Sequence, residues 1–190
     1  MMRIITGRAR GTKLDTLDGL NTRPTSERAK EAIFSMIQFD IADANVLDLF
    51  AGSGQMGLEA LSRGACRATF VDNSKDAVAV INRNVKKTHF ESESIVVNSA
   101  FEQFLKRVAK NEKYDLVFLD PPYASDALIK SLKCLIEYNL LSQNAIFVCE
   151  SGSEDLFGNE LEAQEKFQII KQTKYGVAYV TIMKPCSEEV

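Results

Sequence analysis

Short apolar runs alternate with amphipathic stretches through the middle of the chain, and this rhythm predicts alternating strands and helices. Runs rich in β-forming residues occur at residues 45–50, 68–72, 94–98, 116–120 and 145–150. Helical periodicity fills the intervals between them, at residues 56–63, 75–88, 101–110 and 127–141. This order predicts an α/β fold with a parallel sheet covered on both faces, because parallel strands need long crossover connections.

The two ends of the chain follow other patterns. Residues 3–17 alternate loosely around two glycines, which predicts a short hairpin, and residues 27–38 have the apolar spacing of a helix. Residues 167–174 and 177–184 flank a Tyr-Gly pair and predict a second hairpin, so the last strand should enter the sheet antiparallel. We therefore expect a basic hairpin arm at residues 1–22, one α/β domain at residues 23–185 and a disordered tail at residues 186–190.

Composition narrows the class of protein. The chain has 190 residues, of which 45% are hydrophobic and 26% charged, and these values exclude a disordered or fibrous protein. No apolar run is long enough to cross a bilayer, and the N-terminus turns polar too early for a signal peptide, so we expect a cytoplasmic protein. The four cysteines form no CxxC pair and His89 is the only histidine, so we expect buried thiols and no metal site.

Charge is distributed unevenly along the chain. The net charge is −3, yet the first thirty residues hold seven Lys or Arg against three acids, a local net charge of +4. A basic arm on an acidic body can dock on a polyanion, since nearby charges dominate once salt screens the distant ones. A solvated basic tail is the alternative, and the charge count leaves both interpretations open.

A glycine-rich loop follows the first predicted strand and has the spacing of a nucleotide-cofactor site. The chain runs Asp48-Leu49-Phe50-Ala51-Gly52-Ser53-Gly54 and leads directly into a predicted helix. The glycines let the backbone turn tightly beside a ligand, and the helix N-terminus offers unpaired N–H groups. Asp72 ends the second predicted strand, where an acid can accept hydrogen bonds from a ribose diol.

Two cofactors fit such a loop, NAD and S-adenosylmethionine, and Asp48 distinguishes them. A carboxylate at the mouth of the strand repels a pyrophosphate, whereas it suits a ligand that carries an ammonium group and a positive sulfonium. The sequence therefore favours S-adenosylmethionine over NAD. A glycine-rich turn without a ligand is the structural alternative.

The fourth predicted strand ends in Asp120-Pro121-Pro122-Tyr123, a corner rich in acceptors. Two prolines fix the backbone and remove two N–H donors, which leaves the Asp120 carboxylate and the carbonyl groups to face a ligand. Such acceptors can hold the N–H bonds of an exocyclic amino group and stabilise positive charge on its nitrogen, while Tyr123 can stack on the base. The corner indicates methyl transfer to an amino group, and a proline turn that merely ends a strand is the alternative.

The two motifs together resemble the S-adenosylmethionine-dependent amino-methyltransferases, and the chain is similar to the RsmD family, the bacterial 16S ribosomal RNA guanine-N2 methyltransferases. The resemblance covers nearly the whole chain and includes further motifs, namely Arg3-Ile4-Ile5-Thr6-Gly7, Arg23-Pro24-Thr25, Glu31-Ala32-Ile33-Phe34 and Gly57-Leu58-Glu59-Ala60-Leu61-Ser62-Arg63-Gly64-Ala65. It implies a Rossmann-like class I methyltransferase fold with seven strands, and methylation of a guanine in small-subunit RNA on an assembled or assembling particle.

The resemblance also implies site residues, with neither a metal nor a membrane involved. Target chemistry is expected at Asp120, Pro121, Pro122 and Tyr123. Cofactor contacts are expected at Asp48, Phe50, Gly52, Gly54, Asp72, Asn73, Ser99, Ala100, Phe101 and Thr25. RNA contacts are expected at Arg3, Arg8, Arg10, Lys13 and Arg23. The family often has Glu at the place of Asp72 and an acid near Ser99, and these two differences bear on cofactor affinity.

Other functions stay open at this level. An amino-methyltransferase can act on another RNA, on DNA or on a protein amide by the same corner chemistry, although the chain shows no obvious DNA-recognition domain. An NAD-dependent oxidoreductase shares the glycine loop, but Asp48 argues against it. A non-catalytic ribosome-assembly factor could retain the fold, but the intact Asp120 and Tyr123 argue against that function.

Overall fold

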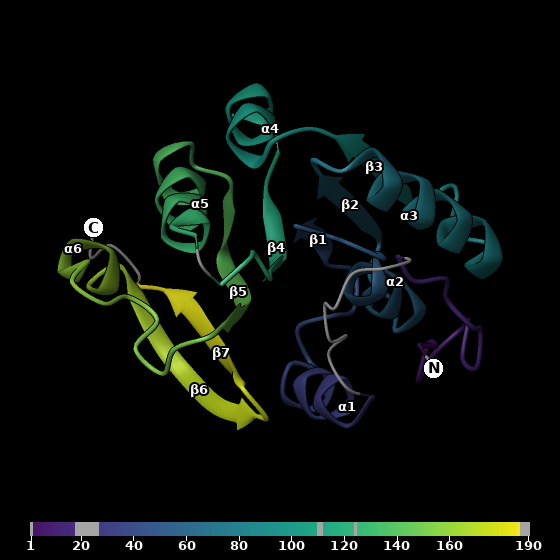
Figure 1. Ribbon diagram of the computed structural model, residues 1–190, viewed down its shortest axis with the longest axis horizontal. Coiled ribbons are helices and arrows are strands. Elements are labelled where there is room, and N and C mark those ends of the chain that lie inside the picture. Colours follow the sequence, from purple (N-terminus) through teal and green to yellow (C-terminus); the bar gives the residue numbers. More distant parts are fainter. Residues whose placement is uncertain (1, 18–26, 110–111, 124, 187–190) are drawn as a thin grey trace.

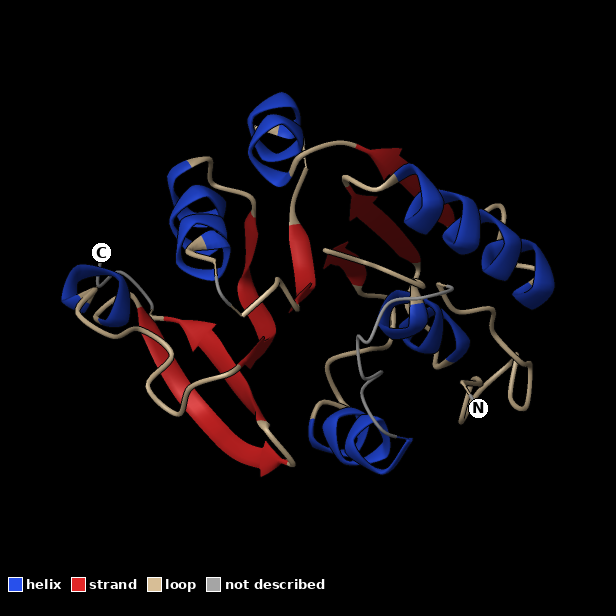
Figure 2. Cartoon of the chain, viewed as in Figure 1, coloured by secondary structure: helices blue, strands red, loops and turns tan. Residues whose placement is uncertain are grey.

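A computed structural model describes residues 2–17, 27–109, 112–123 and 125–186, and within them seven strands form one sheet (Figure 1, Figure 2). The strands are β1 (Asn45–Leu49), β2 (Arg67–Asp72), β3 (Ser94–Asn98), β4 (Tyr114–Leu119), β5 (Leu141–Ser151), β6 (Phe167–Tyr175) and β7 (Ala178–Pro185). The helices are α1 (Glu27–Met36), α2 (Gln55–Ser62), α3 (Lys75–Thr88), α4 (Phe101–Val108), α5 (Ala127–Glu137) and α6 (Leu161–Gln164).

The strand order across the sheet is β3-β2-β1-β4-β5-β7-β6. Strands β1 to β5 are parallel, whereas β7 is antiparallel to both of its neighbours, β5 and β6. The predicted fold class and the antiparallel last strand are thereby confirmed. The chain winds outward from β1 to β3 and returns to β4 on the other side of β1, so the direction of winding switches between β1 and β4, where open α/β sheets bind ligands.

Helices cover both faces of the sheet, as Figure 1 shows, with α1 to α3 on one side and α4 to α6 on the other. Alternate side chains of each strand enter two separate cores. Phe70, Phe118 and Val148 belong to the core beneath α1, α2 and α3. Leu119 and Cys149 belong to the core beneath α4 and α5. This alternation decides which residues at the strand ends face the same side.

The boundary between α5 and β5 differs from the prediction of a helix at residues 127–141. Helix α5 ends at Glu137, and Asn139 adopts a positive φ of 53°, a conformation that stops a helix. The N–H of Leu140 then donates to the carbonyl of Leu135 at 3.0 Å, and β5 begins at Leu141. The apolar Leu140 and Leu141 suit a buried strand as well as a helix, so the sequence pattern did not reveal the break. The short helix α6 was not predicted.

The N-terminal hairpin is present, with a single antiparallel bridge between Arg3 and Lys13 in place of regular strands. The N–H of Ile4 donates to the carbonyl of Thr12 at 3.0 Å, and Ile4 and Leu14 are buried in the core beneath α1 to α3. The hairpin is therefore packed on the body of the protein. The boundary at residue 22 stays a prediction, because residues 18–26 lie outside the described residues.

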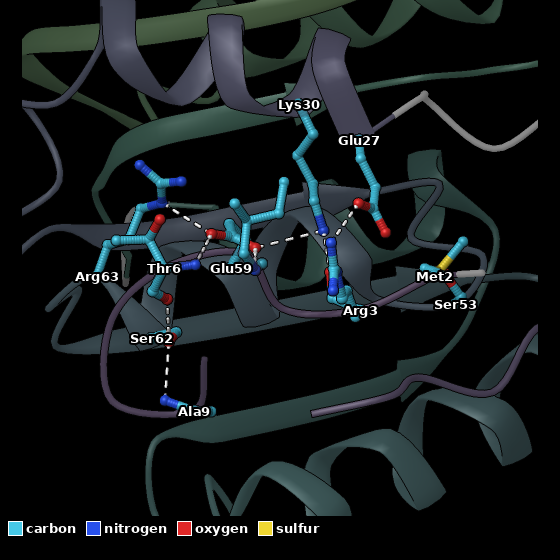
Figure 3. Close-up of polar contacts among 12 residues, drawn as sticks. Met2, Arg3, Thr6, Ala9, Glu27, Lys30, Ser53, Glu59, Ser62 and Arg63 are labelled. Carbon is cyan, nitrogen blue, oxygen red and sulfur yellow. Dashed lines mark hydrogen bonds and ion pairs between the residues drawn. The ribbon is translucent and has the colours of Figure 1, made fainter. Parts of the chain in front are cut away.

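A buried ion pair fastens this hairpin to two helices, as Figure 3 shows. Glu59 of α2 and Lys30 of α1 are both almost fully buried, and their Oε2 and Nζ atoms lie 3.3 Å apart. Arg63 also donates to Glu59, from Nε to Oε1 at 2.9 Å. Loss of hydration lowers the pKa of Lys30, and the adjacent Glu59 opposes this shift.

The same carboxylate holds the hairpin backbone. Glu59 accepts hydrogen bonds from the N–H groups of Ile5 at 2.8 Å and Thr6 at 3.0 Å. Lys30 in turn donates from Nζ to the carbonyl of Arg3 at 2.7 Å. The sequence run Gly57 to Ala65 thus contains a residue whose contacts join α1, α2 and the hairpin.

The cysteines and His89 differ in their exposure to solvent. All four cysteines are free thiols, and Cys149 is buried, but Cys66 and Cys186 are exposed, so the prediction of buried thiols is wrong for these two. Both lie just outside strands, before β2 and after β7, where the sheet no longer covers them. His89 is exposed at the end of α3.

Among the described residues, no helix is long and apolar enough to cross a membrane, and no cluster of three or more potential metal ligands occurs.

Candidate active site

A pocket of about 1080 Å³ lies at the carboxyl ends of β1, β2, β4 and β5, over the switch point of the sheet. We call it the carboxyl-edge pocket. Most of the predicted site residues line it, namely Asp48, Phe50, Gly52, Asp72, Asn73, Ser99, Ala100, Phe101, Asp120, Pro121, Pro122 and Tyr123. The glycine loop and the Asp-Pro-Pro-Tyr corner, far apart in sequence, therefore open into one cavity.

Two predicted cofactor residues are not among those lining residues. Thr25 lies outside the described residues. Gly54 turns the chain into α2 with a positive φ of 76°, and a Cβ on it would lie 3.4 Å from Phe70 and Ile81. Gly54 thus faces the core, and the structure does not place it in the pocket wall. The positive φ of the turn suits a glycine, and a cofactor contact at Gly54 stays a prediction.

The glycine loop is held by two acids from neighbouring strands. Asp72 accepts hydrogen bonds from Gly52 N–H at 2.9 Å and from Ser74 N–H at 2.8 Å. Asp48, almost fully buried, accepts from Gly57 N–H at 3.0 Å in the first turn of α2. Loss of hydration raises the pKa of Asp48 to about 7, the Gly57 bond opposes the shift, and the Asp72 charge adds to it. Both acids thus shape the loop as well as line the pocket.

Phe50 connects this loop to the part of the pocket wall at the start of α4. It has a positive φ of 77°, which is rare for a bulky residue and marks a backbone held by its surroundings. Its ring lies 5.3 Å from that of Phe101, between centroids, at the start of α4. Beside them, the Ser99 hydroxyl donates to the carbonyl of Ala100 at 3.0 Å, and Asn73 is exposed. This end of the pocket offers aromatic surface and few free polar side chains.

The corner after β4, the strand that pairs with β1, forms another part of the pocket wall. Leu119 pairs with Cys149 across β4 and β5, so Asp120 and Glu150 follow that pair side by side. Strand alternation places Glu150 on the face opposite that pair, the face that Asp48 also shares, and Asp120 lines the same pocket. Asp120 is open to the pocket, yet loss of hydration raises its pKa to about 7, and the charges of Glu150 and Asp48 add to the shift.

Glu150 was not predicted as a site residue. The Tyr123 hydroxyl donates to Glu150 Oε1 at 2.5 Å, and Glu150 also lines the pocket. The ring of Tyr123 is half-exposed and packs on Gly152, where a Cβ would lie 3.0 Å from it. Loss of hydration and the bond to Glu150 raise the pKa of Tyr123. The only signal in the sequence was that Glu150 ends a predicted strand.

The ionisable side chains that line the pocket are, apart from Tyr123, all acids. Among the described lining residues there is no Lys, Arg or His, and the acids are Asp48, Asp72, Glu102, Asp120 and Glu150. Such a wall disfavours a pyrophosphate and favours a ligand with positive charge or many hydrogen-bond donors.

The predicted RNA-binding residues lie on the hairpin, apart from Arg23, which is outside the described residues. Arg3 pairs with Glu27 at 3.0 Å, and Arg8 pairs with Glu93 at 3.2 Å. The Arg8 guanidinium also lies over the Phe90 ring at 4.9 Å, so it contributes to packing. Arg10 and Lys13 are exposed. RNA binding stays a prediction at all of these positions. Within the described residues, the side chains of Arg10 and Lys13 form no ion pair and no ring contact.

Comparison with known proteins identifies the family of the chain. The family profile described as conserved hypothetical protein 95 matches residues 2–184. "Ribosomal RNA small subunit methyltransferase D" of Haemophilus influenzae is 34% identical over 177 residues, 93% of this chain and 90% of that protein. The Escherichia coli K12 protein of the same name is 36% identical over 154 residues, 81% of this chain and 76% of that protein.

Solved structures share the fold. The structure of "Putative methyltransferase yhhF" from Escherichia coli has a TM-score of 0.85 and 31% identity, and covers 98% of this chain and 99% of that one. That of a hypothetical protein of Thermus thermophilus has a TM-score of 0.79 and 29% identity, and covers 96% of this chain and 98% of that one. The chain has the methyltransferase fold and belongs to the family of conserved hypothetical protein 95, the RsmD family.

Proposed function

We propose that the protein transfers a methyl group from S-adenosylmethionine to the N2 amino group of a guanine in small-subunit (16S) ribosomal RNA. The observation that carries the proposal is that the glycine loop and the Asp120 corner open into one pocket lined by acids. The names of the relatives support the RNA target. We further propose that the protein acts in the cytoplasm, on assembled or assembling small subunits.

The lining of the pocket fits S-adenosylmethionine. The Asp72 carboxylate stands at the end of β2, where a ribose is bound in folds of this type, and Phe101 offers an aromatic surface to an adenine. The acids suit an ammonium and a sulfonium, whereas NAD would bring a pyrophosphate against them. When bound, S-adenosylmethionine would supply a methyl on a positively charged sulfur, and the sulfur would leave as a neutral thioether.

The chain's own residues prepare the nucleophile. In guanine the N2 lone pair is delocalised into the ring, so the amino group attacks poorly. Asp120 and the carbonyl groups of the Pro121-Pro122 corner are proposed to accept its N–H bonds and to stabilise the positive charge that develops on nitrogen. The methylated nitrogen then loses one proton, to Asp120 or to water, and becomes neutral. Tyr123 is proposed to stack on the base, with its ring already fixed by Glu150 and Gly152.

The deciding experiment is methyl incorporation. Purified protein, labelled S-adenosylmethionine and unmethylated small subunits are incubated, and the RNA is digested and analysed by mass spectrometry, which also locates the modified position. N2-methylguanosine at one position is the expected product. Label found only in the ribosomal proteins would refute the RNA target, and a parallel incubation with DNA tests that substrate. No transfer to RNA, protein or DNA would refute the methyltransferase activity.

The pH dependence of catalysis should follow Asp120. An ionised carboxylate accepts both N–H bonds, whereas a protonated one loses part of that capacity. Because the pKa of Asp120 is raised to about 7, kcat/KM should be about tenfold lower at pH 6 than at pH 8. The measurement is a pH profile of kcat/KM, with Asp120→Asn as control. A wild-type profile that is flat between pH 6 and 8 would contradict the expectation.

The exposed cations of the hairpin should contribute to RNA binding. Replacing Arg10 and Lys13 by alanine is expected to weaken binding to small subunits and to reduce the slope of log K against log salt by about 1 for each phosphate that is no longer neutralised. The measurement is a binding titration at several salt concentrations. The control is the double variant Lys166→Ala/Lys171→Ala, two exposed lysines at the other end of the sheet. Equal slopes in the wild type and the Arg10/Lys13 variant would show that these two cations do not contact RNA and that the hairpin is a solvated basic segment.

A further inference from the structure

The Asp120 corner does not by itself explain why guanine and not adenine is the base. Both bases carry an exocyclic amino group, which the acceptors of the corner can hold. They differ at the adjacent ring nitrogen, because N1 of guanine carries a hydrogen and donates, whereas N1 of adenine accepts. A site that selects guanine therefore needs an acceptor beside the one that holds the amino group.

Glu150 provides an acceptor at that place. Leu119 and Cys149 are paired across β4 and β5, so Asp120, just past the end of β4, and Glu150, in β5, follow that pair side by side. Both line the carboxyl-edge pocket. Loss of hydration and, after it, the charge of Glu150 raise the pKa of Asp120. Two adjacent acceptors match two adjacent donors of one base edge.

Tyr123 strengthens this arrangement. Its hydroxyl donates to Glu150 Oε1 at 2.5 Å, so its hydrogen is not offered to a base. Its ring packs on Gly152, so the side chain of Tyr123 is positioned both at the ring and at the hydroxyl. A carboxylate accepts at up to about four lone-pair positions, so the bond to Tyr123 does not exhaust Glu150 as an acceptor.

We propose that Glu150 selects guanine, by accepting the N1–H of the base while Asp120 and the Pro121-Pro122 corner hold its N2 amino group. This inference rests on the proposed function and names the residue that determines its base specificity. A base whose N1 accepts would direct a lone pair at the carboxylate. It should be disfavoured by about 5- to 150-fold, the range for a well-placed contact to a base edge.

The test uses 2-aminopurine, which keeps the 2-amino group of guanine but has no hydrogen on N1. Small subunits are reconstituted with 16S RNA that carries guanine or 2-aminopurine at the position located in the incorporation experiment. The rate of methyl transfer to each gives a preference ratio. The wild-type protein is expected to prefer guanine by about 5- to 150-fold.

Glu150→Gln should bring the ratio to within about threefold of unity, because an amide can either accept from guanine N1–H or donate to 2-aminopurine N1. Glu150→Ala, which removes the acceptor altogether, is the second variant and should also lose the preference. The matched control is Glu154→Gln, an exposed acid four residues along the chain, which should keep the wild-type ratio.

Tyr123→Phe separates base selection from the positioning of the ring. It removes the hydroxyl bond to Glu150 and retains the aromatic ring, so turnover is expected to fall while the preference for guanine persists. If Tyr123→Phe loses the preference as Glu150→Gln does, Glu150 acts only by holding Tyr123, and the inference is wrong.

The inference and the proposed function fail in different ways. A wild-type ratio retained in Glu150→Gln overturns the inference and leaves guanine methylation intact. Absence of N2-methylguanosine in the unmodified particle with wild-type protein overturns the proposed function, and the assignment of Glu150 with it.

Discussion

Replacing Asp120 by alanine should reduce methyl transfer by about 10²- to 10³-fold, the loss measured when one preorganised electrostatic partner of a transition state is removed. The reason is that positive charge develops on the attacking nitrogen, and Asp120 is the ionisable acceptor at the corner that we assign to the amino group. Cofactor affinity should change little, because the expected cofactor contacts, the glycine loop, Asp72 and Phe101, belong to other segments of the pocket wall, after β1, at the end of β2 and in α4.

The measurement is a single-turnover rate with small subunits, combined with calorimetric titration of S-adenosylmethionine. Asp120→Asn serves as the isosteric variant, and it should be impaired as well, since an amide offers one acceptor oxygen without charge. Asp126→Ala, an exposed acid after the corner that pairs with Lys130, is the matched control. Wild-type turnover in Asp120→Ala would remove this carboxylate from the mechanism, and abolished cofactor binding would place it in the donor site.

Motifs at strand ends could be predicted from sequence because parallel strands place their carboxyl ends at one edge. Asp48, Asp72 and Asp120 each lie at or near the end of a predicted strand, so sequence order alone indicated that they would meet. The structure confirms that they line one pocket. Their role toward cofactor and base stays a prediction.

Glu150 was missed because its importance depends on strand order and register. Glu150 lies beside Asp120 because β5 pairs with β4 in a register that sets Cys149 opposite Leu119. No local sequence pattern encodes that pairing. Gly54 shows the converse. It has the spacing of a ligand-binding glycine, yet its backbone conformation serves the turn into α2.

The count of basic residues in the first thirty positions overestimated the charge available to RNA, because a count does not show which cations pair with acids elsewhere in the chain. Arg8 counted toward a basic arm, but Glu93, which is 85 residues away, lies 3.2 Å from its guanidinium. Lys30 counted toward the same segment, and it is buried against Glu59. The cations that remain available for RNA on the described part of the hairpin are therefore fewer than the count of basic residues suggests.

The buried pair of Lys30 and Glu59 leads to the second large expected effect. Glu59→Ala should lower the free energy of unfolding by about 3–5 kcal/mol, because it leaves the buried Lys30 ammonium without its countercharge. It also removes the acceptor for the Ile5 and Thr6 N–H groups. Urea denaturation followed by circular dichroism measures this. The control is Glu27→Ala, whose pair with Arg3 is exposed and should contribute no more than about 1 kcal/mol.

A double variant distinguishes an uncompensated charge from a missing side chain. If the buried ammonium causes most of the damage, Glu59→Met/Lys30→Met should be more stable than Glu59→Met alone, because apolar side chains can replace a buried ion pair at little net loss. Recovery should be incomplete, since the hairpin N–H groups still lack Glu59 and the Arg3 carbonyl lacks Lys30. A double variant no more stable than Glu59→Met would show instead that the hairpin hydrogen bonds carry the stability, and the ion pair itself would contribute little.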